Sequence, residues 1–189
     1  IPERFGVSTL YVSHALDEVV QVAERLLILS DGQVAAAGRV TDVLTRLDLH
    51  PLTGRFEASV VLDATVARHD DEFALTYLDC GKHTLAVPRS NVAAGLGVKL
   101  RVRARDVSIA LERPSGISIR NLLEGHISAL VEEPDSSYAE VLVDVGNAHV
   151  RARLTRLSVH ELGLHEGMQV VAMVKSVALE RPSASRQTP

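Results

Sequence analysis

The stretch Arg103-Ala-Arg-Asp-Val-Ser-Ile-Ala-Leu-Glu-Arg-Pro114 is followed later in the chain by the similar stretch Ala172-Met-Val-Lys-Ser-Val-Ala-Leu-Glu-Arg-Pro182. The two align if the second copy carries a gap of two residues, and both end on the pentad Ala-Leu-Glu-Arg-Pro. Upstream, Ala86-Val-Pro-Arg-Ser90 parallels Arg153-Leu-Thr-Arg-Leu-Ser158. Chance similarity between valine-rich strands is the alternative, but the shared pentad favours a structural unit that is present twice.

The two units are predicted to be mainly β. From Arg55 onward, short apolar runs alternate with Gly, Asp, Asn and Pro, a spacing typical of a small barrel or sandwich. Each unit offers about five candidate strands and one short helix, which is the inventory of an oligonucleotide/oligosaccharide-binding (OB) barrel. We therefore predict two OB-like barrel repeats, at residues 55–114 and 117–182. Examples of the candidate strands are Ala58–Leu62, Phe73–Leu78, Thr84–Val87, Leu100–Arg105, Gly125–Val131, Ala139–Val145, His149–Leu154 and Gln169–Val174.

A short α/β segment, residues 1–50, precedes the repeats. The apolar run Ser8–Val12 is typical of a buried strand, and apolar residues recur at helical spacing from Leu16 to Leu27. Asp31-Gly32, between two apolar runs, predicts a hairpin, and a turn with a short helix is expected from Gly38 to Leu47. Residues 49–54 form a plausible linker. The Ser-rich residues 183–189 are predicted to be a disordered tail.

Composition excludes several classes of protein. Hydrophobic residues make up 46% of the 189, enough for a packed core. The net charge of −4 lacks the basic excess of nucleic-acid-binding proteins, so no nucleic-acid partner is predicted. The single cysteine, Cys80, excludes an internal disulfide and a metal site made of cysteines alone. No run approaches the ~18 apolar residues that a membrane-spanning helix needs.

The segment Thr9-Leu-Tyr-Val-Ser-His14-Ala-Leu-Asp-Glu18, continued through Ala23–Gly38, resembles the switch-histidine segment of ABC-transporter ATPases. The resemblance covers residues 1–47. It implies that His14 ends a strand and senses the γ-phosphate of ATP in the full-length subunit. An imidazole in that place can donate a hydrogen bond as charge builds on the transferred phosphate. For an isolated histidine, a helix-start residue satisfied by the backbone would be the simpler interpretation; the whole run favours the switch.

Other parts of an ATPase are absent from these residues. The chain contains no Gly-x-x-x-x-Gly-Lys-Ser/Thr loop to hold phosphates. The family's signature motif and its acidic strand are missing too. Because phosphoryl transfer depends on positioning and charge neutralisation, we expect the 189 residues alone not to hydrolyse ATP. ATP and Mg are therefore expected only in the full-length subunit.

The second repeat opens with Gly116-Ile-Ser118-Ile-Arg120-Asn121-Leu-Leu-Glu-Gly125, which resembles the start of the molybdate-binding Mop domain, also called the TOBE domain. The likeness continues through Val143–Gly146, Val150–Thr155 and Leu162–Leu164 to Val170–Val177. It covers residues 117–179 nearly end to end.

This resemblance implies an oxyanion site in the second repeat. A tetrahedral dianion requires hydrogen-bond donors and no carboxylate among its ligands. The predicted oxyanion-binding residues are Ser118, Arg120, Asn121, Lys175 and Ser176. Each cation taken alone would be an ordinary solvated residue, and it is the matched set that favours a site. Where the second repeat has Lys175-Ser176 the first has Arg105-Asp106, so the first copy is expected to be mainly structural.

A metal site is a weaker candidate. His160 and His165, with Glu161 and Glu166, lie around the Leu162-Gly-Leu164 turn. A solvated surface explains them more simply, so no metal cation is predicted.

Together the two resemblances imply the C-terminal part of the ATP-binding subunit of a molybdate or tungstate ABC importer, with a regulatory repeat that senses the oxyanion. They also imply a homodimer through the Mop/TOBE region, a membrane permease as partner, and a cytoplasmic location at the inner face of the membrane. Two alternatives stay open: a TOBE domain of a sugar, polyamine or iron importer, and a molybdate storage or regulator protein. The Ser-x-Arg-Asn and Lys-Ser pairs disfavour the first, and the switch-histidine segment disfavours the second.

Overall fold

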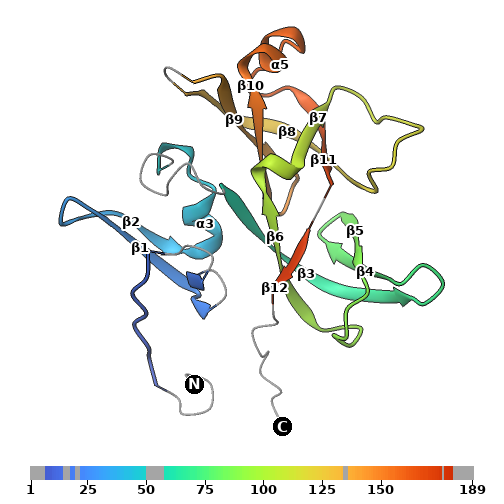
Figure 1. Ribbon diagram of the computed structural model, residues 1–189, viewed down its shortest axis with the longest axis horizontal. Coiled ribbons are helices and arrows are strands. Elements are labelled where there is room, and N and C mark those ends of the chain that lie inside the picture. The colour runs from blue at the N-terminus through green and yellow to red at the C-terminus, as the bar shows by residue number, and fades with distance from the viewer. Residues whose placement is uncertain are drawn as a thin grey trace.

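The computed structural model describes residues 7–14, 18–19, 22–49, 58–133, 136–175 and 177–180. The predicted mainly β fold is confirmed (Figure 1). Short helical elements are α3 (Val40–Leu44), α5 (Arg156–Glu161) and the 3-10 turns η1 (Leu47–Leu49) and η2 (Ala104–Asp106). The strands are β1 (Arg25–Ser30), β2 (Gln33–Arg39), β3 (Ser59–Asp70), β4 (Leu75–Cys80), β5 (His83–Pro88), β6 (Gly97–Arg103), β7 (Val107–Ala110), β8 (Asn121–Glu132), β9 (Tyr138–Asp144), β10 (His149–Thr155), β11 (Gln169–Val174) and β12 (Ala178–Glu180).

The two repeats exchange their last strands. One five-stranded sheet has the order β12-β6-β3-β4-β5, and the other has the matching order β7-β11-β8-β9-β10. Strand β7 ends the first repeat in sequence, yet it pairs with β11 of the second, with Val107 opposite Val174. Strand β12 returns to β6 of the first repeat, with Leu179 opposite Leu100. Figure 1 shows this return as the red strand beside the green one, and each sheet curls into a half-barrel. The sequence boundary between the repeats, at residues 114–117, is therefore crossed by both sheets.

A single hydrophobic core joins the two sheets. One continuous cluster of buried side chains contains Leu62 and Leu85 from the first sheet and Leu123 and Val141 from the second. All four are at most 1% exposed. Sharing the core is a physical advantage, because barrels of about 60 residues bury too little apolar surface on their own.

Strand β8 approaches β9 closely at Gly125. A Cβ atom at Gly125 would collide with the carbonyl oxygen of Asp144 on β9. The register between the two strands then shifts between Ile127 and Ala129, which marks a bulge. A glycine is required here because any side chain would push the strands apart.

The segment before the repeats contains the predicted hairpin and short helix. Strands β1 and β2 pair antiparallel around Asp31-Gly32, and both turn residues have positive φ (50° and 75°). A two-residue turn of this kind matches the right-handed twist of its strands, so it fixes their register. Helix α3 buries Val40 and Leu44 against Val61 of β3, which attaches this segment to the first repeat.

One expectation for this segment is wrong. Residues 8–12 are extended but form no strand, and Leu10 and Val12 are 92% and 86% exposed. A buried strand needs neighbours on its edges, and no described strand pairs with this stretch. Of the helix expected between Leu16 and Leu27, only Glu18, Val19 and Val22 are described as helical, and from Arg25 the chain is strand β1. Residues 15–17, 20–21, 50–57, which include all of the predicted linker except Leu49, and the tail at 183–189 lie outside the described residues.

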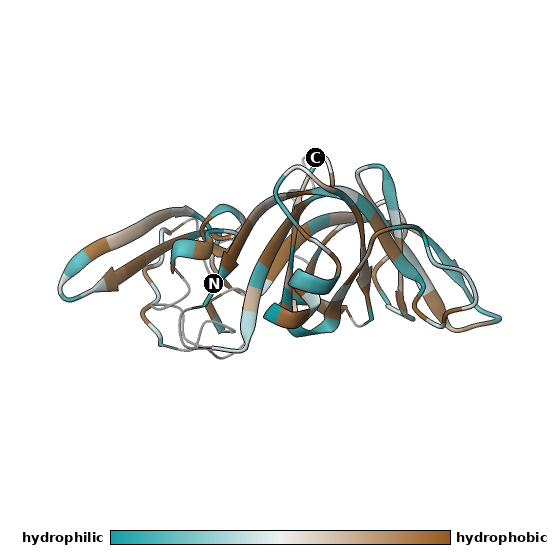
Figure 2. Ribbon diagram, turned by 90° about the horizontal axis from the view of Figure 1, so that it is seen from above, coloured by the Kyte–Doolittle hydropathy of each residue, from teal (hydrophilic) through white to brown (hydrophobic). Residues whose placement is uncertain are grey.

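The hairpin presents an exposed apolar face. Leu27, Leu29 and Val34 are 54%, 64% and 59% exposed, and Figure 2 shows the apolar stretches of the hairpin projecting away from the two sheets. In the described part of the chain, no helix has the length and hydrophobicity needed to cross a bilayer.

Candidate functional site

The predicted cations Arg120 and Lys175 leave the second sheet at the same end. Strands β8 and β11 are antiparallel, and their last paired residues are Asn121 and Val174. Arg120 immediately precedes Asn121, and Lys175 immediately follows Val174, so both chains leave the sheet from this final pair. Both side chains are exposed, as is that of Ser118. Two exposed cations at one end of a sheet are donors open to an anion in solution, and Ser118 lies close to Arg120 in the sequence.

The strand exchange adds a residue of the first repeat to this end of the sheet. The backbone N–H of Lys175 donates to the carbonyl oxygen of Asp106, at 3.0 Å. Asp106 closes turn η2, directly before the exchanged strand β7. The first repeat, which was expected to be mainly structural, therefore places Asp106 beside the predicted ligand Lys175. A carboxylate in that place lowers the local positive potential.

Asn121 binds the first repeat through its side chain. Its Oδ1 accepts a hydrogen bond from the backbone N–H of Ala86 at 2.7 Å, and its Nδ2 donates to the carbonyl oxygen of Ala86 at 3.1 Å. The residue is only 5% exposed. Ala86 belongs to β5, the edge strand of the first sheet. Among the described residues predicted to bind the oxyanion, Asn121 is thus the one whose side chain is buried and hydrogen-bonded to protein.

Other contacts continue this seam between the repeats along β5. A Cβ atom at Gly81 would collide with the side-chain amide of Asn147, which packs directly on this turn. His83 faces the second repeat, and its Nε2 is buried without a hydrogen-bond partner among the described residues. Burial lowers the pKa of His83, and polar backbone groups of Val145 and Glu124 oppose the shift. Burial therefore favours the neutral form of the imidazole.

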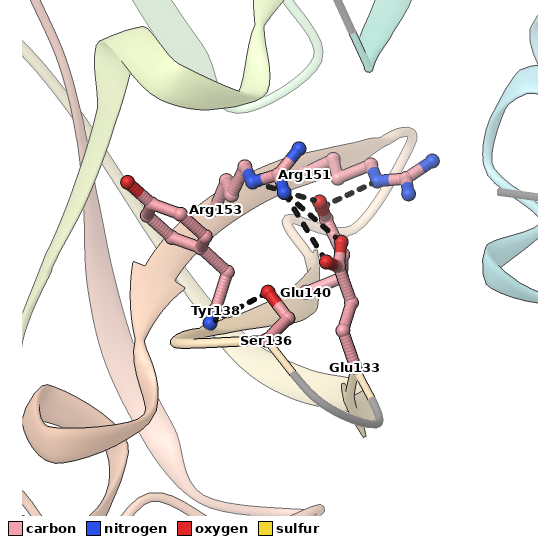
Figure 3. Close-up of polar contacts among 6 residues, drawn as sticks. All are labelled: Glu133, Ser136, Tyr138, Glu140, Arg151 and Arg153. Atoms are coloured by element: carbon pink, nitrogen blue, oxygen red, sulfur yellow. Dashed lines mark hydrogen bonds and ion pairs between the residues drawn. The ribbon is translucent and has the colours of Figure 1, made fainter. Parts of the chain in front are cut away.

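A cluster of charged side chains covers the outer face of the second sheet (Figure 3). Nε of Arg151 donates to Oε2 of Glu140 at 2.7 Å, and the two side chains are 3% and 2% exposed. Arg153 lies between the carboxylates of Glu133, at 3.1 Å, and Glu140, at 3.8 Å. Its guanidinium also stacks 4.6 Å from the ring centre of Tyr138. Arg151 and Glu140 are almost fully buried and paired with each other, so this cluster suits a structural role better than anion binding.

His14 lies on the extended N-terminal stretch and is exposed. Its neighbours are anchored, since the hydroxyl groups of Tyr11 and Ser13 both donate to Oε2 of Glu18, at 2.8 and 3.1 Å. The hydrogen bond to Glu18 raises the pKa of Tyr11. Ser176, the last predicted oxyanion ligand, lies outside the described residues. The structure thus brings Arg120 and Lys175 to one end of a sheet, with Ser118 two residues before Arg120 in the sequence, and leaves His14 on a separate segment.

Two other surfaces do not fit the predicted chemistry. A hollow of about 350 Å³ on the first repeat is lined partly by Asp63, Asp79 and Lys99, and its two carboxylates make it unsuitable for a dianion. Within the described ranges, no three His, Cys, Asp or Glu side chains gather into a group able to hold a metal ion.

Sequence patterns had not singled out Glu140, Arg151 or Ala86. Glu140 and Arg151 lie in strands whose alternate residues form the core. A charged residue between two core positions is the pattern that could have indicated ion pairing on the opposite face of the sheet. Ala86 contributes through its backbone, which leaves no mark in the sequence.

Comparison with known proteins gives a consistent result. The TOBE domain family matches residues 117–180. A molybdenum import ATP-binding protein, ModC, of Paramagnetospirillum magneticum is 39% identical over 181 residues, which are 96% of this chain and 50% of that protein. The ModC of Rhodospirillum rubrum is 36% identical over 194 residues, covering 100% of this chain and 52% of the relative. The chain thus spans about half the length of the curated relatives it matches.

The fold is also similar to a solved structure. The cytoplasmic molybdate-binding protein ModG, crystallised with molybdate bound, superposes with a TM-score of 0.56 at 27% sequence identity. The match covers 65% of this chain and 95% of that one. The resemblance drawn from the sequence is confirmed: residues 117–180 match the TOBE domain family, and nearly the whole chain is similar to part of the molybdenum import ATP-binding proteins.

Proposed function

We propose that this chain is the regulatory, oxyanion-sensing part of the ATPase subunit of a molybdate or tungstate ABC importer. The observation that carries the proposal is the end of the β8–β11 ladder, where Arg120 and Lys175 leave the sheet from the same final pair, Asn121 and Val174. Ser118 lies near this point in sequence and adds a neutral donor, and Ser176 follows Lys175. The names of the ModC relatives and the molybdate bound to ModG support molybdate as the anion.

Further parts of the proposal concern the whole subunit. ATP and Mg would bind only there, with His14 as the switch histidine. The subunit would work at the inner face of the membrane with a permease and would form a homodimer through the TOBE region. Bound oxyanion would then report the intracellular supply to the transporter.

Calorimetric titration of the chain with molybdate, tungstate, sulfate and phosphate tests the proposal. We expect molybdate and tungstate to bind and sulfate to bind much more weakly, because a preorganised set of donors fits one anion radius best. Equal affinity for all four anions would indicate a non-selective basic surface. Binding of none would reopen the choice of substrate, including a sugar, polyamine or iron importer.

A further inference from the structure

Asn121 is the one described residue predicted to bind the oxyanion whose side chain is already engaged by the protein. Its backbone belongs to the second sheet, where it is paired with Val174. Its side-chain amide closes a two-bond ring with the backbone of Ala86 in the first sheet. One residue is therefore held by both repeats.

The amide of Asn121 occupies the place of a neighbouring strand. Ala86 lies opposite Tyr77 of β4, on the edge strand of its sheet. Both polar groups of its backbone point away from β4 and meet the side chain of Asn121. An unpaired strand edge normally has to be covered, and here a single carboxamide supplies the acceptor and the donor that Ala86 requires.

The location of this pair gives it consequences for the anion site. The pair Asn121 and Val174 is the last of its ladder, and the chain continues from it to Arg120 on one side and Lys175 on the other. Fixing Asn121 to the first repeat therefore fixes the point from which both cations emerge. As a ligand Asn121 would be poorly suited, because it is 5% exposed and its amide is engaged with Ala86 on both its oxygen and its nitrogen.

We propose that Asn121 is a positioning residue, which clamps the edge of the first repeat and thereby sets the geometry of Arg120 and Lys175 without touching the oxyanion. This inference rests on the proposed function for its effect on binding, although the clamp itself does not depend on any anion. It gives the first repeat a role in the site of the second. Affinity for the oxyanion should then fall when the contact between Asn121 and the backbone of Ala86 is broken.

The test uses the full 189-residue chain and two substitutions that open the clamp from opposite sides. Asn121→Leu keeps the size of the side chain and removes both hydrogen bonds without adding charge. Ala86→Pro removes the N–H that Asn121 accepts, and since that N–H points away from β4, the ladder within the first sheet is spared. Asn91→Ala, at an exposed loop position, is the matched control.

Two measurements separate a clamp from a ligand. Hydrogen exchange without anion should be faster at the Ala86 amide in Asn121→Leu than in the wild type or the control. Titration with molybdate should show about tenfold weaker binding for Asn121→Leu and for Ala86→Pro, the factor expected from losing roughly one to two hydrogen bonds. The double variant should bind no more weakly than either single one, because both open the same contact.

Several results would overturn the proposal. Weaker binding in Asn121→Leu with unchanged binding in Ala86→Pro would make Asn121 a ligand. Unchanged molybdate affinity in Asn121→Leu would show that the clamp positions nothing, and this outcome decides the question even if Ala86→Pro does not fold. If the wild type binds no molybdate, the proposed function fails, and unchanged exchange at Ala86 in Asn121→Leu would then remove the clamp as well.

Discussion

Arg120 and Lys175 carry the charge of the proposed site, so each should be individually important. A hydrogen bond to a charged group contributes about 1.5–3 kcal/mol. Arg120→Ala or Lys175→Ala should therefore weaken molybdate binding by about ten- to a hundredfold in calorimetric titration. Arg120→Lys should also weaken it, because an ammonium cannot reproduce the guanidinium fork. Arg46, an exposed arginine that follows helix α3, serves as the control. An equal loss of affinity in Arg46→Ala would point to a general charge effect.

Asp106 should oppose anion binding from the first repeat. Its carbonyl oxygen accepts the N–H of Lys175, so Asp106 lies beside one of the two predicted cations. Unit charges about 4 Å apart interact by about 1 kcal/mol in water. Asp106→Asn should therefore tighten molybdate binding by about two- to fivefold at low salt, with a smaller gain at high salt. No change at either salt concentration would show that the carboxylate faces away from the anion.

The strand pair β9–β10 should depend on its buried ion pair. Arg151→Ala would remove the 2.7 Å partner of the buried Glu140 carboxylate, which keeps Arg153 at 3.8 Å, and breaking a buried pair from one side costs about 3–5 kcal/mol. Urea denaturation should show this loss for Arg151→Ala and a smaller one for the double change Arg151→Met with Glu140→Leu. Arg156→Ala removes an exposed pair with Glu132 and should cost no more than about 1 kcal/mol. Equal losses in Arg151→Ala and Arg156→Ala would contradict the burial argument.

The seam between the repeats should make stability depend on pH through His83. Burial lowers the pKa of His83 in the folded protein, with the charge of Lys82 acting in the same direction and Glu124 opposing it. The unfolded chain therefore binds a proton more readily, and stability present above about pH 6.5 is lost as the pH falls toward the folded pKa. Chemical unfolding at about pH 7.5 and about pH 5.5 should show this loss in the wild type. His83→Gln should reduce it, and an identical pH dependence in the variant would assign the effect to other groups.

The whole chain should associate into dimers. The second repeat exposes Val131, Tyr138 and Leu157, at 46%, 45% and 65%, where β8, β9 and α5 meet. Covering apolar side chains gathered at one end of a sheet is favourable. Light scattering should therefore find a dimer, and Leu157→Glu should shift it toward monomer. A monomer at high concentration, with and without molybdate, would contradict this expectation.

Local patterns in the sequence were sufficient for most of the strands, for the hairpin at Asp31-Gly32 and for the duplication. Alternation of apolar and polar residues is a property of neighbouring residues, and Asp-Gly in a two-residue turn specifies positive φ directly. The cations Arg120 and Lys175 were indicated by the resemblance to the Mop/TOBE domain and not by alternation. The local patterns missed β7 and β12, which have only four and three residues and are too short to show a period.

The exchange of these two strands could be seen only in the folded chain. Because the repeats are alike, the edges of β6 and β11 offer similar partners, and sequence does not distinguish pairing within a repeat from pairing across repeats. The consequences are equally non-local: Asp106 meets Lys175, and Asn121 meets the backbone of Ala86, 35 residues away. The amino-acid sequence determined which residues form strands and which carry charge. The folded chain determined which strand edges meet, because pairing depends on backbone groups that every residue shares.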